Sequence, residues 1–214
     1  MKPNPRFSAL QVMQDAPVIP VIVLNDISHA VPLARALVAG GIRMLEVTLR
    51  TPQALACIEA IARDVPEAVV GAGTVRTRAD AQAASMAGAL FAVSPGYTSA
   101  LGQACRDVGL ALLPGVATGG EIMLAQEDGF TELKFFPARG SAGIPWLRNM
   151  APVFPDVVFC PTGGIQPADI PDYLALPNCC TVGGSWIAPS ALVQDQNWPE
   201  ITKLALQSTK MKIC

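Results

Sequence analysis

A regular alternation of short apolar runs and amphipathic stretches constrains the fold of this chain more than any other feature. Eight runs rich in Val and Ile end at intervals of about 21 to 25 residues, the length of a strand-loop-helix-loop unit. These runs are 18–24, 44–49, 68–73, 90–94, 110–115, 132–136, 157–161 and 180–184. Helical periodicity fills the intervening stretches, for example 30–39, 52–64, 78–87 and 99–108. Glycine, which favours a left-handed helix cap, follows several helical stretches at Gly40, Gly41, Gly88, Gly109 and Gly129.

This alternation predicts an α/β fold with a parallel sheet. Its strands are almost continuously apolar, as expected when helices cover a sheet, and the chain is 51% hydrophobic but only 15% charged. An open, doubly wound sheet is the alternative. The even spacing and the length of 214 residues favour a closed (β/α)8 TIM barrel. We expect one domain over residues 1–214, with an extra N-terminal helix at 4–15 and a closing helix at 201–210.

Charge and composition argue against several classes of protein. The formal net charge is −2, without the basic stripe that a nucleic-acid-binding protein needs. The longest apolar run, 18–24, is interrupted by Pro20 and is far too short to span a membrane. The first residues do not resemble a signal peptide, and the six cysteines show no paired spacing, so we expect reduced thiols in the cytoplasm. A single histidine excludes a zinc site built on several histidines.

Lys134 is the most informative residue for function. It is the only lysine in the body of the predicted barrel, since the other four lie near the chain ends. Alternation along the strand places Leu133 and Phe135 on the outer face, so Lys134 should point into the barrel. An enclosed neutral amine attacks carbonyl carbons and forms a Schiff base. The alternative is a lysine that pairs with an inward carboxylate for structural reasons.

Polar residues at the carboxyl ends of neighbouring strands extend this candidate site, because barrel active sites lie at that end. Glu46 interrupts an apolar strand and should share the inward face with Thr48, where it could transfer protons or only balance a nearby cation. Arg50 suits a carboxylate or a phosphate, although a lone arginine is often a surface residue. Thr74 could donate its hydroxyl to a substrate oxygen.

Two glycine pairs follow the seventh and eighth strands, each with a hydroxyl residue beside it. They are Thr162-Gly163-Gly164 and Gly183-Gly184-Ser185. This is the usual phosphate-binding position in such barrels, where backbone N–H groups hold the anion. The residues therefore predict an enzyme that acts on a phosphorylated carbonyl compound through a lysine, as a Schiff-base (class I) aldolase does. The alternatives are a sugar-phosphate isomerase or epimerase, and a barrel that binds phosphorylated metabolites without catalysis.

Six motifs, in this order, resemble the family of 2-dehydro-3-deoxy-6-phosphogluconate (KDPG) and 4-hydroxy-2-oxoglutarate (KHG) aldolases. They are Glu46-Val-Thr-Leu-Arg50, Gly71-Ala-Gly-Thr74, Ser94-Pro-Gly96, Lys134-Phe-Phe-Pro137, Pro161-Thr-Gly-Gly164 and Gly183-Gly-Ser-Trp186. The resemblance implies cleavage of KDPG to pyruvate and glyceraldehyde 3-phosphate, as in the Entner–Doudoroff pathway. Cleavage of KHG, which has no phosphate, is a second implied activity. It also implies a homotrimer and a reaction without metal or other cofactor.

The resemblance further assigns a role to each candidate residue. Lys134 would be the Schiff-base lysine and Glu46 the general acid and base. Arg50 and Thr74 would bind the substrate carboxylate, and Pro95 and Phe136 would line the pyruvyl pocket. The phosphate end would be bound by Thr162, Gly163, Gly164, Gly184 and Ser185.

Two stretches depart from the family pattern. Arg139 in 138–143 replaces an uncharged or acidic residue, and 117–120 is unusually rich in glycine. Either stretch could alter the preference between phosphorylated and unphosphorylated substrates.

Overall fold

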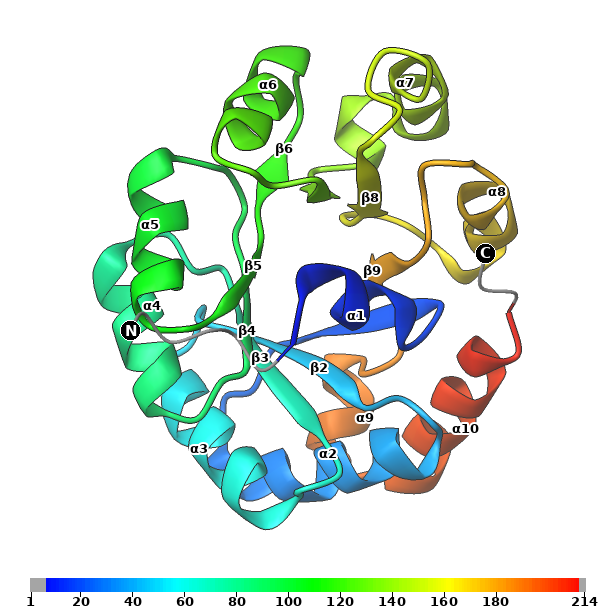
Figure 1. The fold of residues 1–214 in the computed structure, drawn as a ribbon. Helices are drawn as coiled ribbons and strands as arrows, with labels where there is room; N and C mark the ends of the chain where they lie inside the picture. The colour runs from blue at the N-terminus through cyan, green and yellow to red at the C-terminus, as the bar shows by residue number, and fades with distance from the viewer. Residues whose placement is uncertain (1–6, 212–214) are drawn as a thin grey trace.

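The strands form two parallel sheets that together curl around a common interior (Figure 1). A computed structural model describes residues 7–211. Within that range, the larger sheet has the order β5-β4-β3-β2-β1-β9 and the smaller one β6-β7-β8. The strands are β1 Val18–Ile22, β2 Met44–Thr48, β3 Val69–Gly73, β4 Phe91–Val93, β5 Ala111–Leu113, β6 Gly115–Val116, β7 Glu132–Phe135, β8 Val158–Pro161 and β9 Val182–Gly184.

Helices surround the sheets on the outside, and one short helix, α1, lies over the middle of the view in Figure 1. The α-helices are α1 Ala9–Gln14, α2 Ala30–Ala39, α3 Ala54–Asp64, α4 Arg78–Met86, α5 Ser99–Asp107, α6 Gly119–Glu127, α7 Gly143–Met150, α8 Ile170–Leu174, α9 Ser190–Gln194 and α10 Trp198–Thr209. Three short 3-10 helices are η1 Ile27–His29, η2 Arg139–Ser141 and η3 Pro167–Asp169. Helices α2 to α5 agree with the predicted stretches to within two residues at each end. Gly41, Gly88, Gly109 and Gly129 have positive φ, as expected of left-handed caps.

The division into two sheets differs from the single eight-stranded barrel that the sequence predicted. The expected strand 110–115 is split into β5 and β6 at Pro114. Proline has no N–H group to donate to a sheet, so the hydrogen-bonded ladder breaks there. At the other side, β8 and β9 share no continuous ladder. Two isolated bridges, Phe159 to Cys179 and Thr162 to Gly183, connect the two sheets at that point.

Two apolar layers hold the fold together. One layer lies between the strands and the outer helices and includes Leu45, Val47 and Leu133. The other fills the interior and includes Ile19 and Phe91. Successive residues of a strand contribute to opposite layers, which is the alternation expected of strands covered on both faces.

Helix α1 closes one end of the interior. Val12 and Met13 are buried in the interior layer, against residues such as Met44 and Val69 at the beginnings of their strands. The helix starts at Ala9, later than predicted, because the hydroxyl of Ser8 caps the N–H of Gln11. The predicted residues 4–6 lie outside the described range. With the amino ends of the strands covered, the carboxyl ends are left to form a site.

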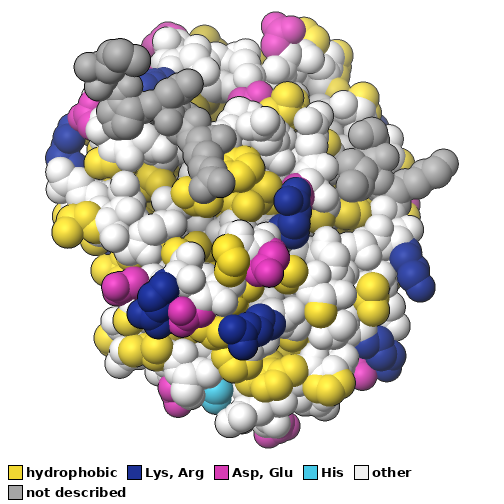
Figure 2. Space-filling view, turned by 60° about the horizontal axis from the view of Figure 1, so that its bottom comes forward, with side chains coloured by type: hydrophobic (Ala, Val, Ile, Leu, Met, Phe, Trp, Pro, Cys, Tyr) yellow, Lys and Arg dark blue, Asp and Glu magenta, His cyan; other side chains and the backbone are white. Residues whose placement is uncertain are grey.

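The closing helix α10 begins three residues earlier than predicted. Asn197 accepts a hydrogen bond from the N–H of Glu200, and Pro199 occupies the first turn, where its missing N–H costs nothing. On the face shown in Figure 2, Lys and Arg side chains lie beside Asp and Glu side chains and form no continuous basic area. No helix within residues 7–211 is long and apolar enough to cross a membrane.

Candidate active site

A cavity of about 390 Å³ opens at the carboxyl ends of the strands. Ten of the eleven predicted site residues line it: Arg50, Thr74, Pro95, Lys134, Phe136, Thr162, Gly163, Gly164, Gly184 and Ser185. The eleventh, Glu46, reaches the site through Lys134. Residues from widely separated strands therefore meet in one place, as the parallel arrangement requires.

Lys134 points inward, as alternation along its strand predicted. Leu133 and Phe135 are fully buried in the layer against the outer helices. The Lys134 side chain is 7% exposed and faces the cavity. Its Nζ also lies 5.1 Å from the centre of the Phe136 ring, an attractive arrangement for a cation and an aromatic face.

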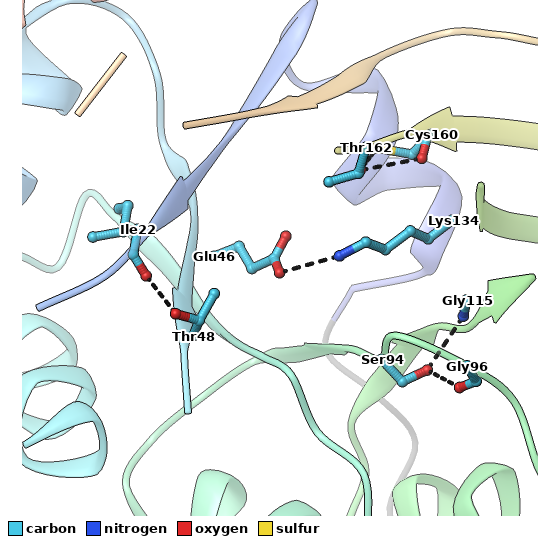
Figure 3. Close-up of polar contacts among 9 residues, drawn as sticks. All are labelled: Ile22, Glu46, Thr48, Ser94, Gly96, Gly115, Lys134, Cys160 and Thr162. Carbon is cyan, nitrogen blue, oxygen red and sulfur yellow. Dashed lines mark hydrogen bonds and ion pairs between the residues drawn. The ribbon is translucent and has the colours of Figure 1, made fainter. Parts of the chain in front are cut away.

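Glu46 and Lys134 point toward one another across the interior (Figure 3), with Glu46 Oε1 3.5 Å from Lys134 Nζ. The Glu46 side chain is 3% exposed, and its Oε1 accepts no hydrogen bond from the described residues. Burying a charged pair is expensive, and a pair kept only for stability should have its remaining oxygen atoms hydrogen-bonded. Here Oε1 meets the Lys134 amine at 3.5 Å, and that amine faces the cavity. A carboxylate placed beside an amine at a cavity can exchange protons with that amine or with a bound molecule.

Gly73 makes room for the Glu46 side chain. A Cβ atom at position 73 would lie 2.6 Å from Cγ and 2.8 Å from Cδ of Glu46, and closer still to Oε1. Real carbon atoms do not approach so closely, so any other residue at this position would push the carboxylate away. Glycine at the end of β3 is therefore part of what sets the distance between Glu46 and Lys134.

A hydrogen-bonded turn holds Pro95 at the cavity wall. The hydroxyl of Ser94, which is fully buried, donates to the carbonyl of Gly96 at 2.7 Å and accepts from the N–H of Gly115 at 3.3 Å. Thr74, on the next loop, has φ of 61°, a left-handed conformation that is costly for a β-branched residue. Both loops are thus held in specific conformations where they face the cavity.

Two glycines shape the Thr162 loop. Gly163 and Gly164 have φ of 104° and 77°, values that side-chain-bearing residues rarely adopt. Thr162 is buried, and its hydroxyl donates to the carbonyl of Cys160 at 3.3 Å. A Cβ atom on Gly183 would lie 2.8 Å from Cγ2 of Thr162, so Gly183 leaves space for this threonine. A glycine of the second pair therefore makes room for the threonine that precedes the first pair.

The Cys160 thiol lies beside the ion pair of Glu46 and Lys134, and its burial makes it unreactive. Cys160 pairs with Lys134 in the register between β7 and β8. Burial raises the pKa of the thiol to about 12, an effect that the nearby Lys134 charge only partly offsets. The reactive thiolate is therefore disfavoured at this position.

Arg50 stands at the cavity with its side chain exposed to solvent. Within the described part of the chain, no carboxylate forms an ion pair with it. Its charge is available to an anionic ligand. The alternative of an unrelated surface arginine does not explain its place on the cavity wall.

The two departures from the family pattern lie in different places. The glycine-rich stretch 117–120 is the start of α6, where Thr118 and Glu121 form a reciprocal cap, and it does not line the cavity. Arg139 lies behind the Thr162 loop. Its Nη1 donates to the carbonyl of Gly164 at 3.3 Å, and it lines a second, shallower cavity of about 300 Å³.

Sequence reasoning missed four residues that line the cavity: Val21, Val23, Ile165 and Gln166. The three aliphatic residues look like any core residue in the sequence. Gly183 also lines the cavity; it belongs to the glycine pair that the sequence placed at the phosphate, although the family resemblance gave it no role of its own. Gln166, just after the first glycine pair, was the one polar signal that could have been used.

In the described range 7–211, no group of three or more His, Cys, Asp or Glu side chains is placed to hold a metal ion.

Comparisons with known proteins point to a single family. A sequence model of the family "KDPG and KHG aldolase" matches residues 10–204. The 2-dehydro-3-deoxy-phosphogluconate aldolase of Pseudoalteromonas atlantica is 49% identical, and the KHG/KDPG aldolase of Escherichia coli K12 is 47% identical; each match covers 97% of both chains. A crystal structure of the Legionella pneumophila KDPG aldolase, with pyruvate captured as a covalent carbinolamine, superposes with a TM-score of 0.93. It is 45% identical, over 95% of this chain and 99% of that one. The chain therefore belongs to the KDPG and KHG aldolase family.

Proposed function

We propose that this chain is a class I aldolase, a lyase that cleaves KDPG to pyruvate and glyceraldehyde 3-phosphate. KHG, which would give pyruvate and glyoxylate, is a second substrate in this proposal. One observation carries the proposal: the Lys134 amine and the Glu46 carboxylate face each other at 3.5 Å beside the cavity. A relative at 45% identity holds pyruvate as a covalent carbinolamine, the adduct that precedes a Schiff base.

In the proposed reaction, Lys134 forms the covalent bond to the substrate. The Lys134 ammonium first loses a proton to solvent, and the neutral amine then adds to the C2 carbonyl to give a carbinolamine. Loss of water from that adduct gives an iminium, in which the positive nitrogen draws electrons from the neighbouring carbon atoms. This electron sink is the reason that the proposed chemistry requires no metal or other cofactor.

Glu46 would move the proton that bond cleavage releases. As the C3–C4 bond breaks, its electron pair enters the iminium to form an enamine, and the C4 hydroxyl passes its proton to the Glu46 carboxylate. The aldehyde then leaves, and Glu46 returns a proton to C3 of the enamine. Water hydrolyses the resulting iminium, which releases pyruvate and restores the Lys134 amine.

The other cavity residues would orient the substrate along its length. Arg50 and Thr74 would bind the carboxylate next to C2, since a guanidinium and a hydroxyl both donate to carboxylate oxygens. Pro95 and Phe136 would form apolar walls around the reacting carbons. The phosphate end would bind at the two glycine-rich turns: Thr162, Gly163, Gly164, Gly184 and Ser185.

We further infer that the two sheets act as one closed (β/α)8 barrel. Two isolated bridges support this closure. The bridge from Phe159 to Cys179 connects β8 to the segment before β9, and the bridge from Thr162 to Gly183 connects the residue after β8 to β9 itself. The proline between β5 and β6 accounts for the break at the other junction.

A homotrimer, which rests on the family resemblance, and a cytoplasmic location, which rests on the reduced thiols, complete the proposal. Met123 and Leu124 on α6 are 57% and 38% exposed, which gives subunit contact an apolar surface. Light scattering at several protein concentrations tests the trimer. Buried free thiols at Cys57, Cys105 and Cys160 are typical of a reducing compartment.

The experiment that tests the activity is borohydride reduction in the presence of pyruvate, followed by intact mass and peptide mapping. We expect one reduced pyruvyl group, on the peptide that contains Lys134. The Lys134→Met variant should take up none, while Lys203→Met, which removes an exposed lysine on α10, should be labelled like the wild type. Folded protein without an adduct would overturn the class I mechanism and favour an isomerase or a non-catalytic binder.

A further inference from the structure

The segment that follows β7 is hydrogen-bonded to the back of the Thr162 loop. The N–H of Ala138 donates to the carbonyl of Thr162 at 2.8 Å, and the N–H of Arg139 donates to the carbonyl of Gly163 at 3.0 Å. The third carbonyl in the series, that of Gly164, accepts from Arg139 Nη1 at 3.3 Å. Three successive carbonyls of the loop are thus turned toward this one segment.

Because the peptide group is planar and trans, the direction of each carbonyl also determines the direction of the N–H group in the same peptide unit. In each peptide unit the C=O and N–H bonds point in opposite directions. The N–H groups of Gly163, Gly164 and Ile165 therefore point away from the 138–139 segment. All three residues line the main cavity, and Gly164 and Ile165 also border the second one. A row of backbone donors on that side suits an anion.

Arg139 contributes a charge as well as a hydrogen bond. Its guanidinium is always protonated, and among residues 7–211 no carboxylate pairs with it. Asp169 lines the same second cavity as Arg139 and accepts from the N–H of Gln166 at 2.9 Å, but it forms no ion pair with the guanidinium. The positive charge therefore lies behind the loop without a direct carboxylate partner.

The arginine stem is also packed against the loop. A Cβ atom on Gly164 would lie 2.9 Å from Cβ and 3.2 Å from Cδ of Arg139, so the arginine side chain occupies the space beside this glycine. A cation bonded to one peptide carbonyl polarises that peptide and strengthens its N–H as a donor on the opposite side. Arg139 therefore strengthens hydrogen-bond donation by the loop N–H groups on the opposite side, without entering the cavity itself.

We propose that Arg139 is a positioning residue that makes the enzyme select substrates with a terminal phosphate. It fixes the Thr162 loop and raises its affinity for a dianion, and it contributes nothing to binding the part of the substrate that reacts. This inference rests on the proposed function. KHG ends in a carboxylate directly on C4 and carries no phosphate, so it serves as an internal reference.

The test compares kcat and KM for KDPG and KHG in four proteins: wild type, Arg139→Gln, Arg139→Lys and Arg148→Gln. The control, Arg148, is an exposed arginine on the neighbouring helix α7 and does not line the cavity. We expect Arg139→Gln to lower kcat/KM for KDPG about fivefold, an effect typical of one charge acting on an anion at a partly exposed site. The loss should lie in KM, shrink in high salt and leave KHG unchanged. Arg139→Lys should recover part of it, and Arg148→Gln should match the wild type.

Either of two results would overturn the proposal: an unchanged ratio of the two specificity constants in Arg139→Gln, or an equal loss for both substrates. A second measurement separates this proposal from the proposed function. Calorimetry with glycerol 3-phosphate, which carries the phosphate but no carbonyl, should show weaker binding to Arg139→Gln than to Arg148→Gln. Equal affinities would refute the role of Arg139 whether or not the wild type cleaves KDPG, and a wild type inactive on both substrates would refute only the activity.

Discussion

Replacing Gly73 by alanine would test whether cleavage depends on the position of the Glu46 carboxylate. An ideal Cβ at position 73 lies 2.6 Å from Cγ and 2.8 Å from Cδ of Glu46, with Oε1 nearer still. Comfortable contacts between carbon atoms are about 3.5 Å, so the Glu46 side chain has to retreat by roughly 1 Å. The atom nearest to the new methyl group is Oε1, which is also the atom 3.5 Å from Lys134 Nζ.

This displacement sets the size of the expected effect. A misplacement of about 1 Å at a reacting group costs on the order of 100-fold in rate. We therefore expect kcat for KDPG cleavage to fall about 100-fold, which corresponds to about 2.7 kcal/mol in the activation barrier. Overpacking at a buried site should also lower the free energy of unfolding by about 1–3 kcal/mol, which leaves a folded protein.

Pyruvate release, followed through NADH consumption by lactate dehydrogenase, gives kcat directly. Urea unfolding of the same preparation checks that the variant is folded. Gly120→Ala is the matched control, because a Cβ atom there meets nothing within 4 Å and the residue lies in helix α6, away from the cavity. If folded Gly73→Ala kept kcat within about threefold of the wild type, the reasoning that the Glu46 position limits catalysis would be refuted.

Four further variants test other parts of the structure. Glu46→Gln should lower kcat roughly 10²- to 10⁴-fold in the same assay while pyruvate can still be trapped by borohydride, and near-normal turnover would contradict its role as the proton carrier. Gly183→Ala should raise KM for KDPG about tenfold, because its methyl group displaces Thr162; an unchanged KM would show that this threonine does not position the phosphate end. Met13→Ala should lower the free energy of unfolding by about 2–5 kcal/mol in urea with kcat unchanged, since Met13 is fully buried at the end opposite the cavity, and a parallel loss of kcat would argue against that separation. Cys160→Ala tests the buried thiol: its pKa rises from 9.0 to about 12 on folding, so its stabilising effect is complete below pH 9 and is lost as pH rises toward 12. The variant should therefore lose less unfolding free energy than the wild type between pH 8 and pH 10.5, and parallel losses would refute this assignment.

Periodicity explains why so much of the scaffold could be predicted from the sequence. A parallel strand covered on both faces needs apolar residues at every position, so a charged residue within it is conspicuous. That is why Lys134 and Glu46 could be identified, and alternation then gave the correct inward direction for Lys134. The glycines that end helices could be recognised for a similar reason, because a left-handed cap has few alternatives. Pro114 lies inside the predicted strand 110–115, and the lack of an N–H group at that position is the sequence feature that accounts for the break between β5 and β6.

Contacts between strands are harder to predict, because alternation gives the direction of a side chain and says nothing of what it meets. The sequence could not show that Gly73 lies against the Glu46 carboxylate, or that Gly183 lies against Thr162, since both contacts depend on the register of neighbouring strands. Arg139 shows the same limit at longer range: its departure from the family pattern is visible in the sequence, yet only the fold shows that it holds the loop from behind. Glycine at such positions is therefore informative for a packing reason as well as a conformational one. Where a catalytic side chain has to cross a narrow interior, the residue that makes room for it determines its position as much as its own strand does, and the Gly73→Ala experiment measures that contribution directly.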